Sequence, residues 1–379
     1  MRDTPAEDSR FQYLETGIVT EAVNGKVFME EYNDCLKEAF TEDEPENSKV
    51  EMAELLYYVD EYKNLQPWNW MDDDEIFIVQ DSETEEFIYC SILGNAGVEF
   101  GLAVFIGDEG LTFLEMLNKA ENANPRFYMK QRSIHLSFSH RDELETEDYK
   151  LLKAFGRSYF GKKEWPQMRS FNPGYYPWFL DEEEVRLFAT VLAQVIKVCE
   201  MAKKDPYLIG VNDGTHYFAR VFNKKTKKWE SGEITLFPNE NYQKNIPLYS
   251  NDIELMQLKK IQKRLNIPVE FDCQNFLTPV QDFPDERPYY SKMILAVDKK
   301  RGIVLFNEFL EFQNEVEAAQ KGVVQFMKQM ECIPREVFVT EETAQWIMPI
   351  AKKLNIKLIV VHSLPITEEV YKEMDEMLK

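Results

Sequence analysis

Met293-Ile-Leu-Ala-Val-Asp298 is the stretch that decides the fold, because it opens a pattern that the chain uses twice. This apolar strand ends in an acid. It is followed by a second strand, an amphipathic helix over 316–330 and an Ile-Pro strand over 333–339. Tyr207-Leu-Ile-Gly-Val-Asn-Asp213 opens an earlier copy, whose helix and last strand fall within 253–271. Strands that alternate with helices of this length predict an α/β domain with a mixed sheet and two pseudo-repeated strand-strand-helix-strand units.

The first half of the chain has a different order of elements. Apolar runs over 76–79, 87–93 and 100–106 are bounded by turn-forming residues and predict an antiparallel meander. Helical spacing over 52–65, 111–120 and 145–155, with a strand over 133–138, completes an α+β domain.

A proline-rich stretch and a long helix close this first domain. Residues 165–178 contain three prolines, and we expect them to form an irregular loop. Asp181 with Glu184 three residues later predicts the N-terminal cap of a helix that ends near Lys203, before Pro206.

These patterns divide the chain into three parts. A chain of 379 residues exceeds what one hydrophobic core serves, so at least two domains are expected. We predict an acidic appendage or linker over 1–50, an α+β domain over 51–204 and an α/β domain over 205–379. A sub-boundary near residue 285 is left open.

Charge and cysteine usage exclude several classes of protein. The net charge of -23, from 67 acidic and 44 basic residues, repels nucleic acids and anionic membranes. The five cysteines are odd in number and widely spaced, and the four histidines lack metal-ligand spacing. With acids at the N-terminus and no apolar run of bilayer length, we expect an acidic cytoplasmic protein with neither metal nor cofactor.

Several motifs in the first half resemble those of an uncharacterised bacterial family that joins two domains of unknown function. They are Trp68-Asn-Trp-Met71, the strands over 85–94 and 101–107, Trp165-Pro166 and Pro173-Gly-Tyr-Tyr-Pro-Trp178. The resemblance runs from about residue 56 to the C-terminus. It implies a bacterial origin and a two-domain layout, and it carries no catalytic residues.

Six aromatic side chains are candidates for a binding groove, because aromatic rings offer flat faces at a low entropic cost. These candidates are Trp68, Trp70, Trp165, Tyr175, Tyr176 and Trp178. The alternative is that they pack loops onto the domain, since burial is the commoner fate of aromatic residues.

The acids at strand ends offer a different hypothesis, a ribonuclease-H-like site. Two divalent cations in such a site need three or more carboxylates at strand and helix ends. Asp298, Glu341 and Glu342 are placed somewhat in this way, although the first sheet segment offers two strands where that fold has three. Turn and cap roles are the alternative for these acids.

No nucleotide-binding or hydrolase signature is present in the sequence. The sequence therefore predicts a non-catalytic cytoplasmic binding or interaction protein, with a protein or peptide partner at the aromatic residues and no nucleic-acid or membrane partner. The alternative is a ribonuclease-H-like metal-dependent phosphoesterase or nuclease.

Overall fold

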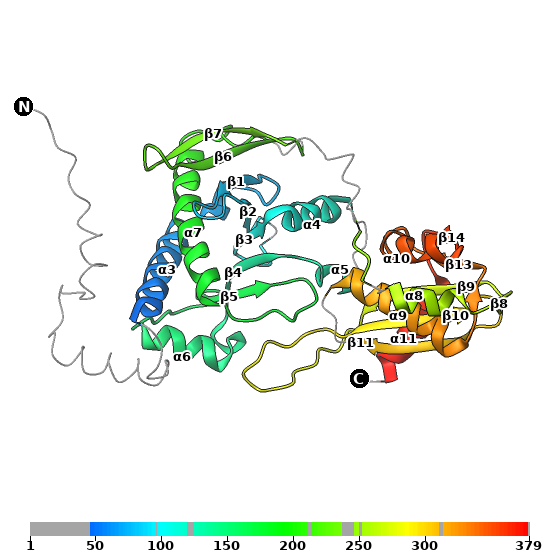
Figure 1. Ribbon diagram of the computed structural model, residues 1–379. Helices are drawn as coiled ribbons and strands as arrows, with labels where there is room; N and C mark the ends of the chain where they lie inside the picture. The colour runs from blue at the N-terminus through cyan, green and yellow to red at the C-terminus, as the bar shows by residue number, and fades with distance from the viewer. Residues whose placement is uncertain are drawn as a thin grey trace, which may run out of the picture. The chain divides into compact units, whose positions relative to one another are not determined.

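The computed structural model describes residues 46–95, 97–119, 125–210, 214–236, 246–249, 252–310 and 314–377. Nearly all of the appendage predicted over 1–50 lies outside these residues. The chain forms two compact units, each with its own sheet (Figure 1). The N-terminal unit comprises 1–119, 132–171 and 178–238, and the C-terminal unit comprises 120–131, 172–177 and 239–379. The predicted mixed α/β class is confirmed for both halves.

The N-terminal unit is built on a seven-stranded mixed sheet. Its strand order is β5-β4-β3-β2-β1-β6-β7. The strands are β1 (Phe77–Gln80), β2 (Phe87–Leu93), β3 (Gly101–Ile106), β4 (Ser133–Ser139), β5 (Trp165–Phe171), β6 (His216–Asn223) and β7 (Lys228–Thr235). All neighbours pair antiparallel except β1 and β6, which are parallel. The predicted antiparallel meander corresponds to β1, β2 and β3.

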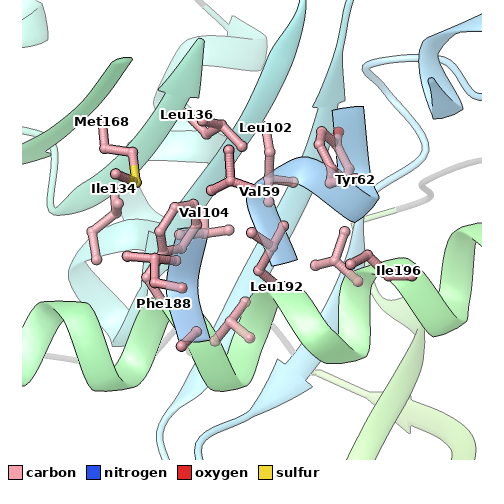
Figure 2. Close-up of a cluster of buried hydrophobic side chains, with 14 of the residues drawn as sticks. Val59, Tyr62, Leu102, Val104, Ile134, Leu136, Met168, Phe188, Leu192 and Ile196 are labelled. Atoms are coloured by element: carbon pink, nitrogen blue, oxygen red, sulfur yellow. The ribbon is translucent and has the colours of Figure 1, made fainter. Parts of the chain in front are cut away.

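Two long helices, α3 (Glu46–Leu65) and α7 (Glu182–Ala202), bury their apolar faces against one face of this sheet (Figure 2). The helices of the unit are α3 (Glu46–Leu65), α4 (Gly107–Lys119), α6 (Thr146–Ala154) and α7 (Glu182–Ala202), with short 3-10 turns at Pro67–Asn69 and Arg141–Glu143. Val59 of α3, Leu192 of α7 and Leu102 of β3 are fully buried in one cluster. Each such side chain contributes about 1.5–3 kcal/mol through the hydrophobic effect.

The start of α7 confirms the predicted cap. The Asp181 carboxylate accepts a hydrogen bond from the Glu184 backbone N–H at 2.9 Å, and the Glu184 carboxylate accepts one from the Asp181 N–H at 3.1 Å. This reciprocal arrangement satisfies two backbone donors that a helix start leaves without partners.

The stretch after Trp165 differs from the predicted irregular loop. Residues Trp165–Phe171 form β5 and pair with β4, so that Pro166 lies opposite Phe138. Because β5 is the last strand on its side of the sheet, the N–H that proline lacks is not needed by a further neighbour. Proline content alone was therefore a poor guide to this segment.

The first copy of the repeated pattern is divided between the two units. Its hairpin, β6 and β7, joins the N-terminal sheet through the parallel pairing of Ala219 with Ile78. The N-terminal unit thus extends to Pro238, beyond the boundary expected after residue 204. Residues 207–210 form turns instead of the predicted strand, and 211–213 are outside the described residues. The two copies are therefore not equivalent units of one sheet.

The C-terminal unit contains a five-stranded mixed sheet in the order β11-β10-β9-β13-β14. Its elements are α5 (Pro125–Tyr128), α8 (Asp252–Lys259), β8 (Arg264–Leu265), β9 (Val269–Asn275), β10 (Lys292–Asp298), β11 (Ile303–Leu310), α9 (Glu315–Met330), β12 (Ile333–Pro334), β13 (Glu336–Val339), α10 (Glu341–Leu354), β14 (Lys357–Val360) and α11 (Pro365–Met377). Strands β9, β10 and β11 form an antiparallel meander, whereas β13 and β14 run parallel to β9.

Helices cover both faces of the C-terminal sheet (Figure 1). Alternate residues of β10 point to opposite faces: Ile294 packs with α8, α9 and α10, whereas Leu295 packs with Tyr371 of α11. The closing segments of the two copies lie side by side, because β8 pairs with β12 and β9 with β13, both in parallel.

Two further properties concern the cysteines and the helices of the described residues. Cys90, Cys199, Cys273 and Cys332 are free and buried. Among the described helices, none combines the length and the apolarity that crossing a bilayer needs.

Candidate ligand-binding site

The C-terminal sheet has a topological switch point between β9 and β13. These strands are parallel neighbours, but the chain continues from β9 to β10 and β11 on one side and from β13 to β14 on the other. In open α/β sheets, the crevice outside the carboxyl ends of the strands at such a point is the usual place for a ligand.

A cavity of about 520 Å³ lies at this point, within the size range of small-molecule sites. We call it the switch-point cavity. Its lining comes from the end of β9, the residues after β13 and β14, the first residue of α9 and the segment around α5. The lining residues are Arg126, Phe127, Lys130, Asp272, Cys273, Gln274, Asn275, Glu315, Thr340, Glu341, Glu342, Thr343, Trp346, Val360, Val361 and His362.

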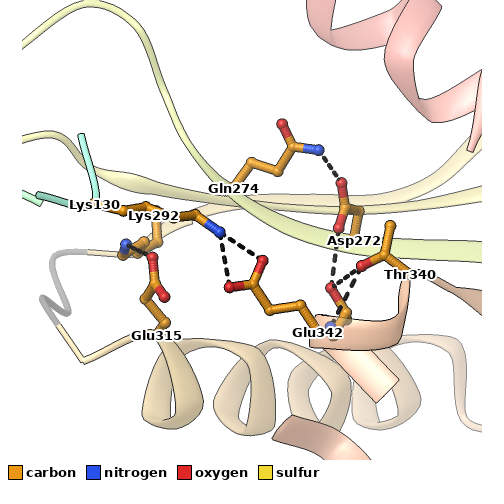
Figure 3. Close-up of polar contacts among 8 residues, drawn as sticks. Lys130, Asp272, Gln274, Lys292, Glu315, Thr340 and Glu342 are labelled. Carbon is orange, nitrogen blue, oxygen red and sulfur yellow. Dashed lines mark hydrogen bonds and ion pairs between the residues drawn. The ribbon is translucent and has the colours of Figure 1, made fainter. Parts of the chain in front are cut away.

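Asp272 is the most deeply buried acid of this cavity, with 2% of its surface exposed. Its Oδ1 accepts a hydrogen bond from the Thr343 hydroxyl at 3.2 Å, and its Oδ2 accepts one from the Gln274 amide (Figure 3). Burial raises the pKa of Asp272 to about 6, although these hydrogen bonds act in the opposite direction. The carboxyl group is therefore charged at neutral pH at a substantial energetic cost.

Two lysines neutralise two glutamates at the helix starts (Figure 3). The Lys130 ammonium donates to both carboxylate oxygens of Glu342, at 2.7 and 2.5 Å. The Lys292 ammonium donates to Glu315 at 3.0 Å. Burial would lower the pKa of Lys130, but the charges of Glu342 and Glu315 outweigh it and raise the pKa. Lys130 is therefore charged, and both lysines are engaged by a glutamate.

Asn275 contributes an unused acceptor to the cavity wall. Its side chain is 5% exposed, and its Oδ1 has no hydrogen-bond partner among the residues described. The backbone carbonyl of Asn275 is satisfied separately, by the Arg126 Nε at 2.9 Å. A buried acceptor without a donor is costly, so a ligand that brings an N–H or O–H donor would be favoured here.

Cys273 does not offer a reactive nucleophile. Burial raises the pKa of its thiol, so the thiol remains protonated at neutral pH. Within the described parts of the chain, no group of three His, Cys, Asp or Glu side chains is arranged to hold a metal ion.

The structure brings only part of the predicted acidic set together. Glu341 and Glu342 line the switch-point cavity, but Asp298 does not. Asp298 pairs with Val269, three residues before Asp272 on β9, or ~10 Å along the strand. Its carboxylate accepts hydrogen bonds from the Lys300 and Arg301 backbone N–H groups, which is the turn role that the sequence left open.

The sequence reasoning missed Asp272 and Glu315. The strand around Asp272 was expected to end at Phe271, whereas β9 continues to Asn275. An acid inside an apolar strand was the signal that could have identified it. The same extension supplies the third antiparallel strand, since β9, β10 and β11 form one meander where two strands were counted.

The six aromatic candidates are divided between the two units. Trp68, Trp70, Trp165 and Trp178 belong to the N-terminal unit, whereas Tyr175 and Tyr176 belong to the C-terminal unit. The ring of Trp68 packs against Phe100 with centroids 5.5 Å apart. Trp165 is 7% exposed and Trp178 forms a β-bridge with Ser170.

The two tyrosines also pack within their own unit. Tyr175 forms a β-bridge with Tyr289, and the ring of Tyr176 lies 6.2 Å from that of Tyr290. Tyr176 keeps 41% of its surface exposed. The contacts of the aromatic residues therefore favour the packing interpretation over a single groove.

Comparison with known proteins identifies a domain in each half of the chain. Residues 53–220 match a family described as Domain of unknown function (DUF7309), and residues 254–375 match Domain of unknown function (DUF6930). The predicted combination of two domains of unknown function is thereby confirmed. Neither the curated proteins nor the solved structures gave a match.

Proposed function

We propose that this combination of two domains of unknown function is a non-catalytic binding protein that takes up a ligand in the switch-point cavity. The observation that carries the proposal is the buried Asn275 acceptor, which receives no hydrogen bond from the part of the chain that the structure describes, in the wall of a cavity at a topological switch point. We further place the protein in the bacterial cytoplasm, in keeping with the four free and buried thiols among the described residues.

The chemistry of the cavity supports binding without catalysis. Lys130 and Lys292 are each held by a glutamate, and the Cys273 thiol is protonated. Catalysis by covalent attack needs a nucleophile activated by a neighbouring base, and the protonated thiol lacks that activation. Hydrogen-bonding groups around an apolar wall, which includes Trp346 and Val361, are instead typical of a recognition site.

Substitution of Asn275 by leucine tests the proposal. The Oδ1 atom accepts no hydrogen bond from the described residues, so its removal should leave the thermal midpoint close to that of the wild type. A diverse library of small polar compounds is screened by thermal shift, and hits are confirmed by calorimetry. Hits should stabilise the wild type and lose affinity in Asn275→Leu.

The matched control is Asn307→Leu, the same change at an exposed position of β11 that does not line the cavity. This control should bind every hit as the wild type does. If no compound binds, or if all hits bind Asn275→Leu equally well, the switch-point cavity is not the binding site and the proposal fails.

A metal-dependent phosphoesterase is the second candidate function. It is favoured by one observation, that Asp272, Glu315 and Glu342 line the same cavity beside a three-stranded meander. Lys130 and Lys292 would have to release the two glutamates before a cation could be shared. Calorimetry with Mg²⁺ and Mn²⁺ and incubation with labelled RNA and DNA test this candidate. Absence of both binding and cleavage would eliminate it.

A further inference from the structure

We infer that the ligand of the switch-point cavity is an organic cation, with an ammonium or guanidinium group carried on a short apolar body. The inference rests on the proposed binding function and adds the chemical class of the ligand. Three properties of the cavity support it: its charge, its hydrogen-bonding groups and its apolar wall.

The acidic groups of the cavity outnumber the basic ones. Four carboxylates line it, from Asp272, Glu315, Glu341 and Glu342, against the cations of Arg126 and Lys130. Lys292 adds one further cation through its ion pair with Glu315. Asp272 and Glu341 form no ion pair with any described residue. A bound cation would therefore compensate charge that the protein leaves uncompensated.

The free hydrogen-bonding capacity of the cavity is also on the acceptor side. Asn275 presents an amide oxygen without a donor, and the Asp272 carboxylate has lone pairs beyond those used by Thr343 and Gln274. Ammonium and guanidinium groups carry several N–H donors and no acceptor. Such a group would satisfy Asn275, and its hydrogen bond to Asp272 would be charge-assisted.

The remaining wall fits the body of such a ligand. Phe127, Trp346, Val360 and Val361 line the cavity, and their surfaces can cover methylene groups. The net charge of -23 further raises the local concentration of cations and repels anions. An anion such as a phosphate ester would meet an excess of carboxylates and is therefore disfavoured.

Calorimetry with matched probes tests the inference. Cadaverine is the cation, pentanediol the neutral analogue of similar length, and glutarate the anionic one. Agmatine supplies a guanidinium group, and an end-blocked lysine peptide distinguishes a peptide side chain from a free amine. At least one of the three cationic probes, cadaverine, agmatine or the blocked lysine peptide, should bind. Pentanediol and glutarate should not bind.

Two variants separate specific binding from general attraction to an acidic protein. Asp272→Asn should weaken cation binding about tenfold or more, since it removes the charged acceptor of a charge-assisted hydrogen bond. Asp298→Asn, the same change at an equally buried position of β10 outside the cavity, should leave the affinity unchanged.

Cation binding that is equal in Asp272→Asn and the wild type would overturn the inference. Binding of pentanediol or glutarate in preference to the cations, or binding of Mg²⁺ alone, would also overturn it. In each of these cases the proposed binding function would still stand if the library hits require Asn275. Failure of the cations together with failure of every library compound would reject both the inference and the proposed function.

Discussion

The Asp272→Asn variant should make the C-terminal unit more stable at neutral pH, because the wild-type carboxylate is buried and forms no ion pair with a described residue. Thr343 and Gln274 donate to this carboxylate in the wild type. An asparagine oxygen can keep one of these bonds, and the Gln274 amide can reorient to accept the other. The substitution therefore removes the charge while the hydrogen bonds are largely kept.

The pKa of Asp272 sets the magnitude and the pH window of this effect. The pKa is raised from 3.8 to about 6, so the folded protein binds the proton more tightly than the unfolded chain does. Well below pH 3.8 the group is neutral in both states and costs nothing. Between pH 3.8 and about 6 the unfolded chain is ionised while the folded state still holds its proton, so stability falls across this window by about 3 kcal/mol, at 1.36 kcal/mol per pH unit. Above about pH 6 the loss is complete.

The free energy of unfolding of the variant and the wild type is measured by urea unfolding at pH 4 and pH 7.5. Pulsed hydrogen exchange with mass spectrometry of β9 and β10 peptides assigns the transition to the C-terminal unit. The variant should exceed the wild type by about 3 kcal/mol at the higher pH and by little at the lower pH. Asp298→Asn, the matched control, should bring no gain in stability, because the Asp298 carboxylate accepts hydrogen bonds from two backbone N–H groups of its turn. Equal stability at both pH values, or a loss at the higher pH, would refute the reasoning about the buried charge.

Three further substitutions test the packing and the polar contacts of the two units. Glu270→Ala should destabilise the C-terminal unit by about 3–5 kcal/mol in the same urea assay, because the fully buried Glu270 carboxylate accepts hydrogen bonds from the Ile366 N–H and from the Thr367 N–H and hydroxyl, which would lose their acceptor. A loss below about 1 kcal/mol would contradict this. Asp181→Ala should cost the N-terminal unit about 1 kcal/mol through loss of the α7 cap, with calorimetry as the readout and an unchanged midpoint as the contrary result. Gly322→Ala in α9 should lower stability by about 1–3 kcal/mol, because a new Cβ would lie 2.6 Å from the Ile294 side chain; a gain would show that helix propensity outweighs the clash.

The elements with strong local periodicity were predicted closely. The helix expected over 316–330 is Glu315–Met330, and the helix expected from residue 181 is Glu182–Ala202, with its cap at Asp181. Helices depend on contacts three and four residues apart, so a short stretch of sequence contains the information that places them. Strand β5 was missed because the tolerance of proline depends on whether a strand lies at the edge of its sheet.

The candidate site was predicted only in part. Glu341 and Glu342 were placed correctly after the end of a strand, because the apolar pattern of the sequence shows both β13 and the helix α10 that follows it. Asp298 lies outside the site, since β10 runs antiparallel to β9 and its end meets the start of β9. Strand direction is a property of pairing, and it cannot be read from the apolar pattern of a strand alone.

The sequence by itself determined that the chain is mixed α/β, where its main helices lie, that its charge is strongly acidic and that acids lie at the end of the strand over 293–298 and just after the strand over 337–340. Only the tertiary structure decided that the hairpin β6–β7 belongs to the N-terminal sheet and that Lys130 neutralises Glu342, 212 residues away. The physical reason is that helix periodicity and charge are local properties, whereas sheet pairing, burial and the ion pairs of a cavity join residues that are far apart in the chain.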